Sequence, residues 1–173
     1  MIVRAATQAD AAALAAIYGD AVLHGFGTFE EVAPSPADMD GRRRAVQDMG
    51  LPYLVAEIDG EVLGFAYAGP FRPRAAYRYT LEDSVYVAPQ AKGKGVGRAL
   101  LAAVIEACEA LGVRQLMAVI GDSANEASIR LHARLGFRMI GQEAAVGLKF
   151  GRWVDVVQMQ LALGEGRATT PQD

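Results

Sequence analysis

Residues 85–98 read Val-Tyr-Val-Ala-Pro-Gln-Ala-Lys-Gly-Lys-Gly-Val-Gly-Arg, and this stretch decides the fold. The β-rich start predicts a strand that Pro89 stops, and the apolar spacing beyond Gly97 predicts a long helix. Glycines between the two elements let a ligand approach the backbone, and the free N–H groups of a helix start point at an anion. Positive charge comes from Lys92, Lys94 and Arg98. The stretch predicts a phosphate site, most naturally for a pyrophosphate, with a plain tight turn as the alternative.

Two common nucleotide motifs are excluded at this position. The dinucleotide-binding fingerprint requires G-x-G-x-x-G, but the sixth position counted from Gly93 is Arg98. The P-loop pattern G-x-x-x-x-G-K-[ST] does not occur here either. The phosphate site therefore belongs to another kind of strand–loop–helix unit.

The rest of the chain alternates between helix and strand patterns. Helices are expected at about 8–20, from a cap at Ser35 or Asp38 through Arg42–Arg44 in a region that Pro52 ends, after Gly97 to Leu111 with a stop at Gly112, and over Asn125–Leu135. Strands are expected over Tyr53–Ile58, Val62–Ala68, Leu81–Val87, Val113–Ile120, Phe137–Glu143 and Trp153–Leu163. This order predicts an α/β (α+β) fold in which helices flank a central mixed, mostly antiparallel, twisted sheet. One domain, residues 1–163, is expected, followed by a flexible tail, residues 164–173.

Composition limits the possible partners. The 173 residues include 17 basic and 20 acidic side chains, and the net charge of −3 argues against nucleic acid. The single cysteine, Cys108, excludes an intramolecular disulfide and a cysteine-based zinc site. No apolar run approaches the roughly 20 residues that span a bilayer. Because the N-terminus also shows no secretory layout, we expect a cytoplasmic protein that does not associate with membranes.

The strand–loop–helix of residues 85–97 resembles the acetyl-CoA motif of the GNAT N-acetyltransferases, Arg/Gln-x-x-Gly-x-Gly/Ala, with Lys92 at its first position. The resemblance implies the GNAT fold and acetyl-CoA as co-substrate, with no metal. It implies that backbone amides of residues 93–98 hold the pyrophosphate, while Val85 and Val87 pair with the pantetheine arm. The cofactor-binding residues expected from it are Val85, Tyr86, Val87, Lys92, Gly93, Lys94, Gly95, Val96, Gly97, Arg98, Asn125 and Ser128.

A narrower resemblance points to one branch of this family. Segments such as Thr28-Phe29-Glu30, Gly69-Pro70-Phe71-Arg72 and Gly151-Arg152-Trp153-Val154-Asp155 resemble phosphinothricin and methionine sulfoximine N-acetyltransferases, which acetylate the α-amine of small amino-acid analogues. The branch implies a homodimer, with Lys149 and Trp153 reaching a neighbouring subunit. An amino-acid carboxylate suits the planar fork of arginine. The substrate-binding residues expected are Phe29, Glu30, Arg72, Arg74, Tyr77 and Arg78.

The reaction requires a base for the ammonium group and a proton for the leaving thiolate. The resemblance places the base carboxylate at Glu82, whereas Asp83 points to the opposite face of a regular strand. It places the oxyanion donor at the backbone amide of Val87. His132 is the candidate that protonates the coenzyme A thiolate, with a tyrosine as the alternative. Each residue also has a structural alternative to its catalytic role. Glu82 could form an ion pair with a neighbouring arginine, and His132 could pack between helix and sheet.

Two other kinds of function stay open. One keeps the fold and cofactor but changes the acceptor to a protein N-terminus, a polyamine or an aminoglycoside. The arginine-rich loop before Glu82 counts against such cationic acceptors. The other is a non-catalytic domain that binds coenzyme A, although neither the glycines nor a candidate base is missing. Outside these motifs, Arg42-Arg43-Arg44 predicts a solvated helix face, and His24 falls in an expected loop.

Overall fold

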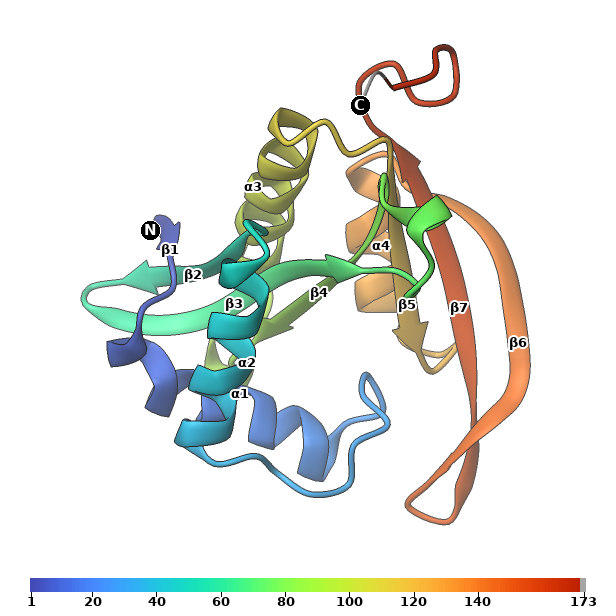
Figure 1. Cartoon of the computed structure of the whole chain (residues 1–173). Coiled ribbons are helices and arrows are strands. Elements are labelled where there is room, and N and C mark those ends of the chain that lie inside the picture. The colour runs from blue at the N-terminus through green and yellow to red at the C-terminus, as the bar shows by residue number, and fades with distance from the viewer. Residues whose placement is uncertain (172–173) are drawn as a thin grey trace.

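Seven strands form one sheet with helices on both of its faces (Figure 1) in the computed structural model, which describes residues 1–171. The strands are β1 (Ile2–Ala5), β2 (Tyr53–Ile58), β3 (Glu61–Pro70), β4 (Thr80–Val87), β5 (Gln115–Gly121), β6 (Arg138–Lys149) and β7 (Arg152–Ala162). The helices are α1 (Ala11–His24), α2 (Pro36–Asp48), α3 (Val96–Ala110) and α4 (Glu126–Arg134), with short 3-10 turns η1 (Gln8–Asp10), η2 (Ala75–Tyr77) and η3 (Pro89–Ala91). The sheet order is β1-β2-β3-β4-β5-β7-β6, and only β4 and β5 pair in parallel. The predicted fold class is confirmed.

Alternate side chains of the central strands lie on two faces, which different helices cover. On one face, the rings of Phe65 in β3 and Tyr86 in β4 stack 5.2 Å apart, and Tyr18 of α1 meets Tyr86 edge-on at 4.8 Å. On the other face, α3 lies so close to β3 that a Cβ on Gly64 would be 2.8 Å from Val96. Even-numbered residues of β4 therefore face α1, and odd-numbered residues face α3 and α4.

The sheet splits between β4 and β5, which separate toward their C-terminal ends. The two strands pair from Thr80–Gln115 to Asp83–Ala118. Beyond this point, which we call the fork, β4 continues to Val87 and β5 to Gly121 without pairing between their described residues. A cleft lies beyond the fork, at the C-terminal ends of the two strands. Helices α3 and α4 begin beside these strand ends (Figure 1).

Two helix ends differ from the sequence expectations. α1 runs to His24 rather than ending near residue 20, and the His24 ring pairs with Asp20 one turn earlier at 3.0 Å. Helical spacing thus continues until Gly25 ends it. α3 ends at Ala110, so Leu111 is an exposed cap residue rather than the last member of the apolar face.

Two other differences arise from side-chain pairing and bulges. Arg43 is buried rather than solvated, because its guanidinium hydrogen-bonds to Asp40 and Gln47 on the same helix. β6 extends to Lys149, six residues beyond the expected strand Phe137–Glu143. Register shifts between residues 139 and 141 and between 143 and 147 break the alternation by which a strand is recognised.

Beyond β7, residues 164–169 form turns and bends near the start of β5. Arg114 Nη1 lies 3.5 Å from Glu165 and 3.3 Å from Thr169. The expected flexible tail includes residues 172–173, which lie outside the described residues. None of the helices in the described part of the chain is long and apolar enough to cross a membrane.

Candidate active site

The cleft beyond the fork holds a cavity of about 860 Å³. Its walls come from residues 83–87 of β4, most of the segment 91–98, residues 118–121 of β5, and α4. The end of α1 and residues 25–27 close another side. Ten of the predicted cofactor residues meet here: Val85, Tyr86, Val87, Lys92, Gly93, Gly95, Gly97, Arg98, Asn125 and Ser128.

The loop before α3 has the geometry of an anion-binding turn. Gly93 and Gly95 have φ values of 78° and 83°, a left-handed conformation that favours glycine. Gly95 caps α3, and the first N–H groups of a helix have no partner within it. Lys92 and Arg98 line the cavity beside these amides. The residues present therefore fit a pyrophosphate group.

Two predicted cofactor residues do not line the cavity. The Lys94 side chain is exposed elsewhere, and the Val96 side chain is buried in the core, so Val96 offers only its backbone N–H. Gly97 has a packing role as well. A Cβ on Gly97 would lie 3.3 Å from Leu131 and 3.4 Å from Val87, so this glycine lets α3 approach β4 and α4 closely.

The free edge of β4 faces the cleft. The Ala88 N–H donates to the Leu63 carbonyl of β3 at 2.9 Å. Because successive N–H groups of a strand point to opposite edges, those of Val85 and Val87 point away from β3, toward the gap left by β5. This edge fits an extended amide-containing arm that adds to the sheet as a further strand.

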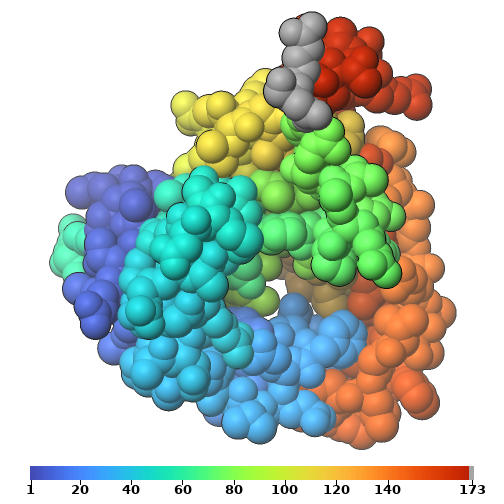
Figure 2. All heavy atoms as spheres, in the orientation of Figure 1, coloured from blue at the N-terminus to red at the C-terminus, as the bar shows by residue number. Residues whose placement is uncertain are grey.

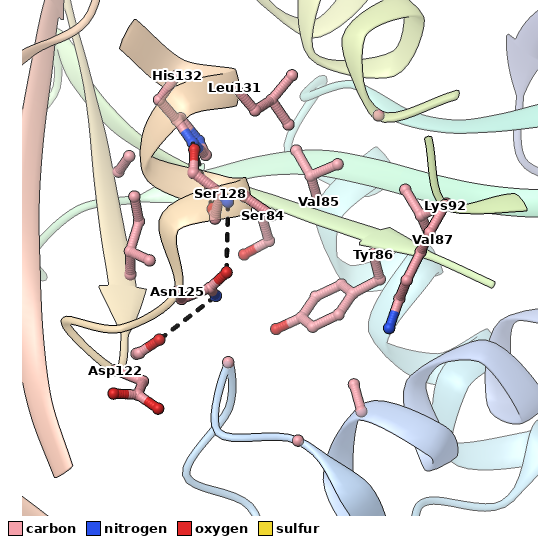
Figure 3. Close-up of a pocket in the computed structure, with 18 of the residues that line it drawn as sticks. Ser84, Val85, Tyr86, Val87, Lys92, Asp122, Asn125, Ser128, Leu131 and His132 are labelled. Atoms are coloured by element: carbon pink, nitrogen blue, oxygen red, sulfur yellow. Dashed lines mark hydrogen bonds between the residues drawn. The ribbon is translucent and has the colours of Figure 1, made fainter. Parts of the chain in front are cut away.

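Helix α4 forms the opposite wall of the cavity (Figure 3). Asn125 caps this helix, because its Oδ1 accepts the Ser128 N–H at 3.3 Å while its Nδ2 donates to the Gly121 carbonyl at 3.4 Å. Asn125, expected to face the cofactor arm, therefore also fixes the start of α4. The Tyr86 ring projects into the same space from β4 (Figure 3).

Glu82 stands one residue before the fork, on the face of β4 that looks toward α1. Its side chain is half-buried. Burial, aided by the neighbouring charge of Asp83 and opposed by that of Arg72, raises the pKa of Glu82 to about 7. A carboxylate with such a pKa accepts and releases a proton near neutral pH, as a general base must.

Asp83 points to the other face of β4, where it meets His132 of α4. Asp83 Oδ2 lies 2.9 Å from His132 Nε2, and His132 Nδ1 lies 2.8 Å from the Ser128 carbonyl oxygen. Both side chains are almost fully buried, and both line the cavity. Burial lowers the pKa of His132, but Asp83 and the Ser128 carbonyl outweigh this effect and raise the pKa above its ordinary value.

The acidic side chains on the cavity wall have separate partners rather than a common centre. Within residues 1–171 there is no group of three or more His, Cys, Asp or Glu that could hold a metal ion. The observed pairs are Asp20 with His24 at 3.0 Å, Asp83 with His132 at 2.9 Å, and Asp122 with Arg152 at 2.6 Å.

None of the residues predicted to bind an amino acid lines this cavity. Figure 2 shows a hollow framed by the segment after α1 (blue), the β3–β4 connection (green) and β6 (orange). All of the predicted substrate residues lie on the first two of these segments. Arg72 stacks on Phe71 at 4.9 Å from the ring centroid and acts electrostatically on Glu82. Phe71 meets Tyr77 edge-on at 5.8 Å. The other predicted residues of this connection, Arg74 and Arg78, are exposed.

The segment between α1 and α2 carries the remaining two predicted substrate residues. Glu30 accepts hydrogen bonds from the Tyr18 hydroxyl at 2.9 Å and from both terminal nitrogens of Arg42 at 2.7 and 3.0 Å. Its carboxylate therefore fixes the segment to both helices. Phe29 packs over β6, where a Cβ on Gly147 would lie 1.9 Å from its ring.

Several contacts that hold this segment were not expected from the sequence. A Cβ on Gly121 would lie 2.2 Å from the Phe26 carbonyl oxygen. Lys149, expected to reach a neighbouring subunit, is instead buried in its own chain and donates from Nζ to the Thr28 carbonyl at 2.8 Å. The sequence held one sign of the contact at Phe26, because a glycine in a strand, here Gly121, often marks a site where another backbone segment approaches closely.

Comparison with known proteins agrees with the site geometry. Residues 21–137 match the model of the acetyltransferase (GNAT) family. The chain is 53% identical over 170 residues to phosphinothricin N-acetyltransferase of Alcaligenes faecalis, covering 98% of this chain and 86% of that protein. It is 44% identical over 171 residues to the L-methionine sulfoximine/L-methionine sulfone acetyltransferase of Salmonella typhimurium, covering 97% and 98%.

A solved structure shows the same likeness in three dimensions. The GNAT superfamily phosphinothricin acetyltransferase from Sinorhizobium meliloti, crystallised in complex with AcCoA, superposes with a TM-score of 0.96 at 47% identity. The match covers 99% of this chain and 93% of that chain. The resemblance drawn from residues 85–98 is confirmed, and the chain belongs to the GNAT family of N-acetyltransferases.

Proposed function

We propose that this enzyme transfers an acetyl group from acetyl-CoA to the α-amine of a small amino acid or analogue of the phosphinothricin, methionine sulfoximine or methionine sulfone type. The observation that carries the proposal is Glu82, whose pKa is about 7, at the fork between a pyrophosphate-fitting cavity and an arginine-bearing rim. Relatives at 53% and 44% identity are named for these activities. Because acetyl-CoA is available in the cytoplasm, we place the reaction there.

Glu82 is the proposed general base. An α-ammonium group must lose a proton before its nitrogen can attack a carbonyl carbon. The half-buried Glu82 carboxylate accepts this proton directly or through one water molecule. Because its pKa is about 7, the carboxylate is ionised in a large fraction of the molecules at neutral pH. It is also more basic than an ordinary glutamate, which favours proton transfer from the ammonium group.

The backbone of β4 supplies the proposed oxyanion donor. When bound, acetyl-CoA supplies the acetyl group as a thioester whose thiol is the leaving group. The N–H groups of Val85 and Val87 both point to the cleft, but a strand rises about 3.3 Å per residue. Val85 is thus roughly 10 Å along the chain from Glu82, and Val87 roughly 17 Å. We therefore place the donor at Val85 rather than at Val87.

Arg72 is the proposed carboxylate-binding residue, because it is exposed on the rim and acts electrostatically on Glu82. Arg72→Ala should raise KM for the amino acid about 10- to 100-fold. This factor corresponds to the loss of one hydrogen bond to a charged group, which contributes about 1.5–3 kcal/mol. It should also move the acid limb of kcat/KM to higher pH, because the Arg72 charge lowers the pKa of Glu82. Initial rates at varied acceptor concentration test both effects.

The matched control for this variant is Arg44→Ala, which removes an exposed arginine on α2. It should leave KM unchanged. Normal saturation by the amino acid in the Arg72→Ala protein would remove Arg72 from the carboxylate site.

The function itself is tested by thiol release from acetyl-CoA against a panel of acceptors. The panel contains methionine sulfoximine, methionine sulfone, phosphinothricin, the common amino acids, a polyamine and an aminoglycoside. Turnover of the first three is expected, with product analysis locating the acetyl group on the α-nitrogen. Turnover of only the polyamine or the aminoglycoside would show that the substrate class is wrong. Binding of acetyl-CoA without any turnover would favour a non-catalytic domain.

We also propose that the protein forms a homodimer through the outer side of β6 and β7. β6 is an edge strand, and apolar residues are exposed along it and on its partner strand. These residues are Met139, Ile140, Val146, Leu148 and Trp153. Leu148 and Trp153 are directly opposite in the register of the two strands. A second copy of the chain would cover this surface.

The double variant Leu148→Glu, Trp153→Glu should convert the dimer into a monomer, because four like charges would meet in a symmetric interface. Light scattering after size-exclusion chromatography should give about twice the 18.4 kDa chain mass for the wild type and one chain mass for the variant. Leu111→Glu, at an exposed residue on the end of α3, is the control and should remain dimeric. A monomeric wild type would exclude the dimer.

A further inference from the structure

The cofactor cavity holds more positive charge than its pyrophosphate-fitting turn requires. Besides Lys92 and Arg98 at that turn, Arg130 and Arg134 of α4 line the same cavity. The acidic side chains of the wall do not balance these groups, because each acidic side chain is already paired with a histidine or an arginine. The whole chain has a net charge of −3, so the excess of positive charge is a local feature of this site.

Arg130 and Arg134 lie beside the turn that precedes α3. They are one helical turn apart, so they share one face of α4. Leu131, in the same part of the helix, packs on the start of α3, because a Cβ on Gly97 would lie 3.3 Å from Leu131 Cδ2. The two arginines therefore border the cavity next to the helix start whose first N–H groups have no partner within α3.

Both arginines are available to a ligand. The Arg134 side chain is exposed and takes part in no ion pair within residues 1–171. Arg130 Nη1 donates to Glu126 at 2.7 Å, but the two side chains are 63% and 69% exposed. An ion pair exposed to this degree contributes little to stability, so Arg130 can exchange the carboxylate for a more highly charged group.

We propose that Arg134, with Arg130 beside it, binds the phosphomonoester on the ribose of acetyl-CoA, so that the enzyme distinguishes coenzyme A from its dephospho form. The same ribose carries the pyrophosphate, so the monoester lies only a few bonds from a pyrophosphate held at residues 93–98. A phosphomonoester has a charge of about −1.5 to −2 at neutral pH and three strong acceptor oxygens. The planar fork of a guanidinium donates two parallel hydrogen bonds to such a group. The inference rests on the acetyl-CoA site of the proposed function but not on the identity of the acceptor.

The test compares the binding of acetyl-CoA with that of acetyl-3′-dephospho-CoA, which lacks only this phosphate. Calorimetric titration of the free protein gives both dissociation constants without an acceptor. The wild type should bind acetyl-CoA about tenfold more tightly, the low end of what a hydrogen bond to a charged group contributes, because the arginines are exposed. The preference should shrink as the salt concentration rises, since salt screens exposed charges.

Arg134→Ala should remove most of this preference. The Kd for acetyl-CoA should rise about tenfold, while the Kd for acetyl-3′-dephospho-CoA should change by less than about twofold, because only the first ligand loses a hydrogen bond to a charged group. Arg130→Ala should act in the same direction but more weakly, because Arg130 must first leave Glu126. Arg134→Lys should keep part of the preference, because an ammonium group retains the charge without the planar fork.

The matched control is Arg138→Ala, which removes an exposed arginine just beyond α4 that does not line the cavity. It changes the charge by the same amount and should leave the ratio of the two dissociation constants unchanged. An arginine in the last turn of a helix also stabilises the helix dipole. Losing only that role would lower the thermal stability of Arg134→Ala but would not change this ratio in the folded protein.

The outcomes separate this inference from the proposed function. Equal affinity of the wild type for the two ligands would overturn the inference, and so would a preference that Arg134→Ala leaves intact. A wild type that shows the Arg134-dependent preference but acetylates none of the panel would support the inference and reject the proposed function. Turnover of the panel at equal KM for the two acetyl donors would do the reverse.

Discussion

Glu82→Gln is expected to lower kcat/KM for the amino-acid acceptor by about 100-fold or more, the usual contribution of a general base. The amide has nearly the same shape as the carboxylate but cannot accept the ammonium proton. Acetyl-CoA affinity should stay nearly unchanged, because Glu82 faces α1 and does not line the cofactor cavity. Steady-state rates and calorimetric titration with acetyl-CoA measure the two quantities separately.

The pH profile adds a second expectation for Glu82. The base works only when ionised, so the wild-type kcat/KM should rise with pH and level off above about 7, the pKa of Glu82. This limb should be absent from the Glu82→Gln profile. Glu106→Gln, which changes an exposed carboxylate on α3, is the control and should keep both the rate and the limb. Turnover of Glu82→Gln at the wild-type rate would contradict the assignment.

The local patterns of the chain predicted most of the fold, because its elements depend on neighbours in sequence. The glycines at 93 and 95 have the left-handed backbone that their residue type favours, and Asp59-Gly60, a typical hairpin-turn sequence, has positive φ at both residues between β2 and β3. These conformations follow from sterics within a few residues. The anion-binding turn before α3 follows from the glycine conformations, because the first N–H groups of a helix are free to bind an anion.

The parts that could not be predicted depend on contacts between distant residues. Periodicity places Asp83 on a face of its strand but does not reveal that His132, 49 positions later, takes up its carboxylate. The burial of Lys149 depends on the Thr28 carbonyl, 121 positions earlier. Such pairs cannot be recognised in a single sequence, because each polar or charged residue, taken alone, would be expected on the protein surface.

Gly121→Ala is the other substitution from which we expect a large effect, because it tests such a distant contact. Gly121 has an ordinary backbone conformation, so alanine meets no dihedral strain there. The added methyl group would, however, lie 2.2 Å from the Phe26 carbonyl oxygen, and backbone cannot move aside as a side chain can. Overpacking of this kind costs about 1–3 kcal/mol in the free energy of unfolding. Chemical denaturation should show that loss.

Gly121→Ala should also lower activity in the protein that remains folded, because residues 25–27 line the cofactor cavity and the same segment continues to Phe29 beside the acceptor hollow. A displacement of about 1 Å in a positioning element can cost roughly 100-fold in rate, so kcat/KM should fall by about that factor. Gly41→Ala adds the same methyl group to α2, where nothing lies within 4 Å, and should keep full activity. Suppose instead that Gly121→Ala is as active as Gly41→Ala. The close contact between Gly121 of β5 and the Phe26 carbonyl would then not be needed to hold the segment between α1 and α2 in its active position. Substrate positioning would then have to come from the arginine-bearing connection between β3 and β4 alone.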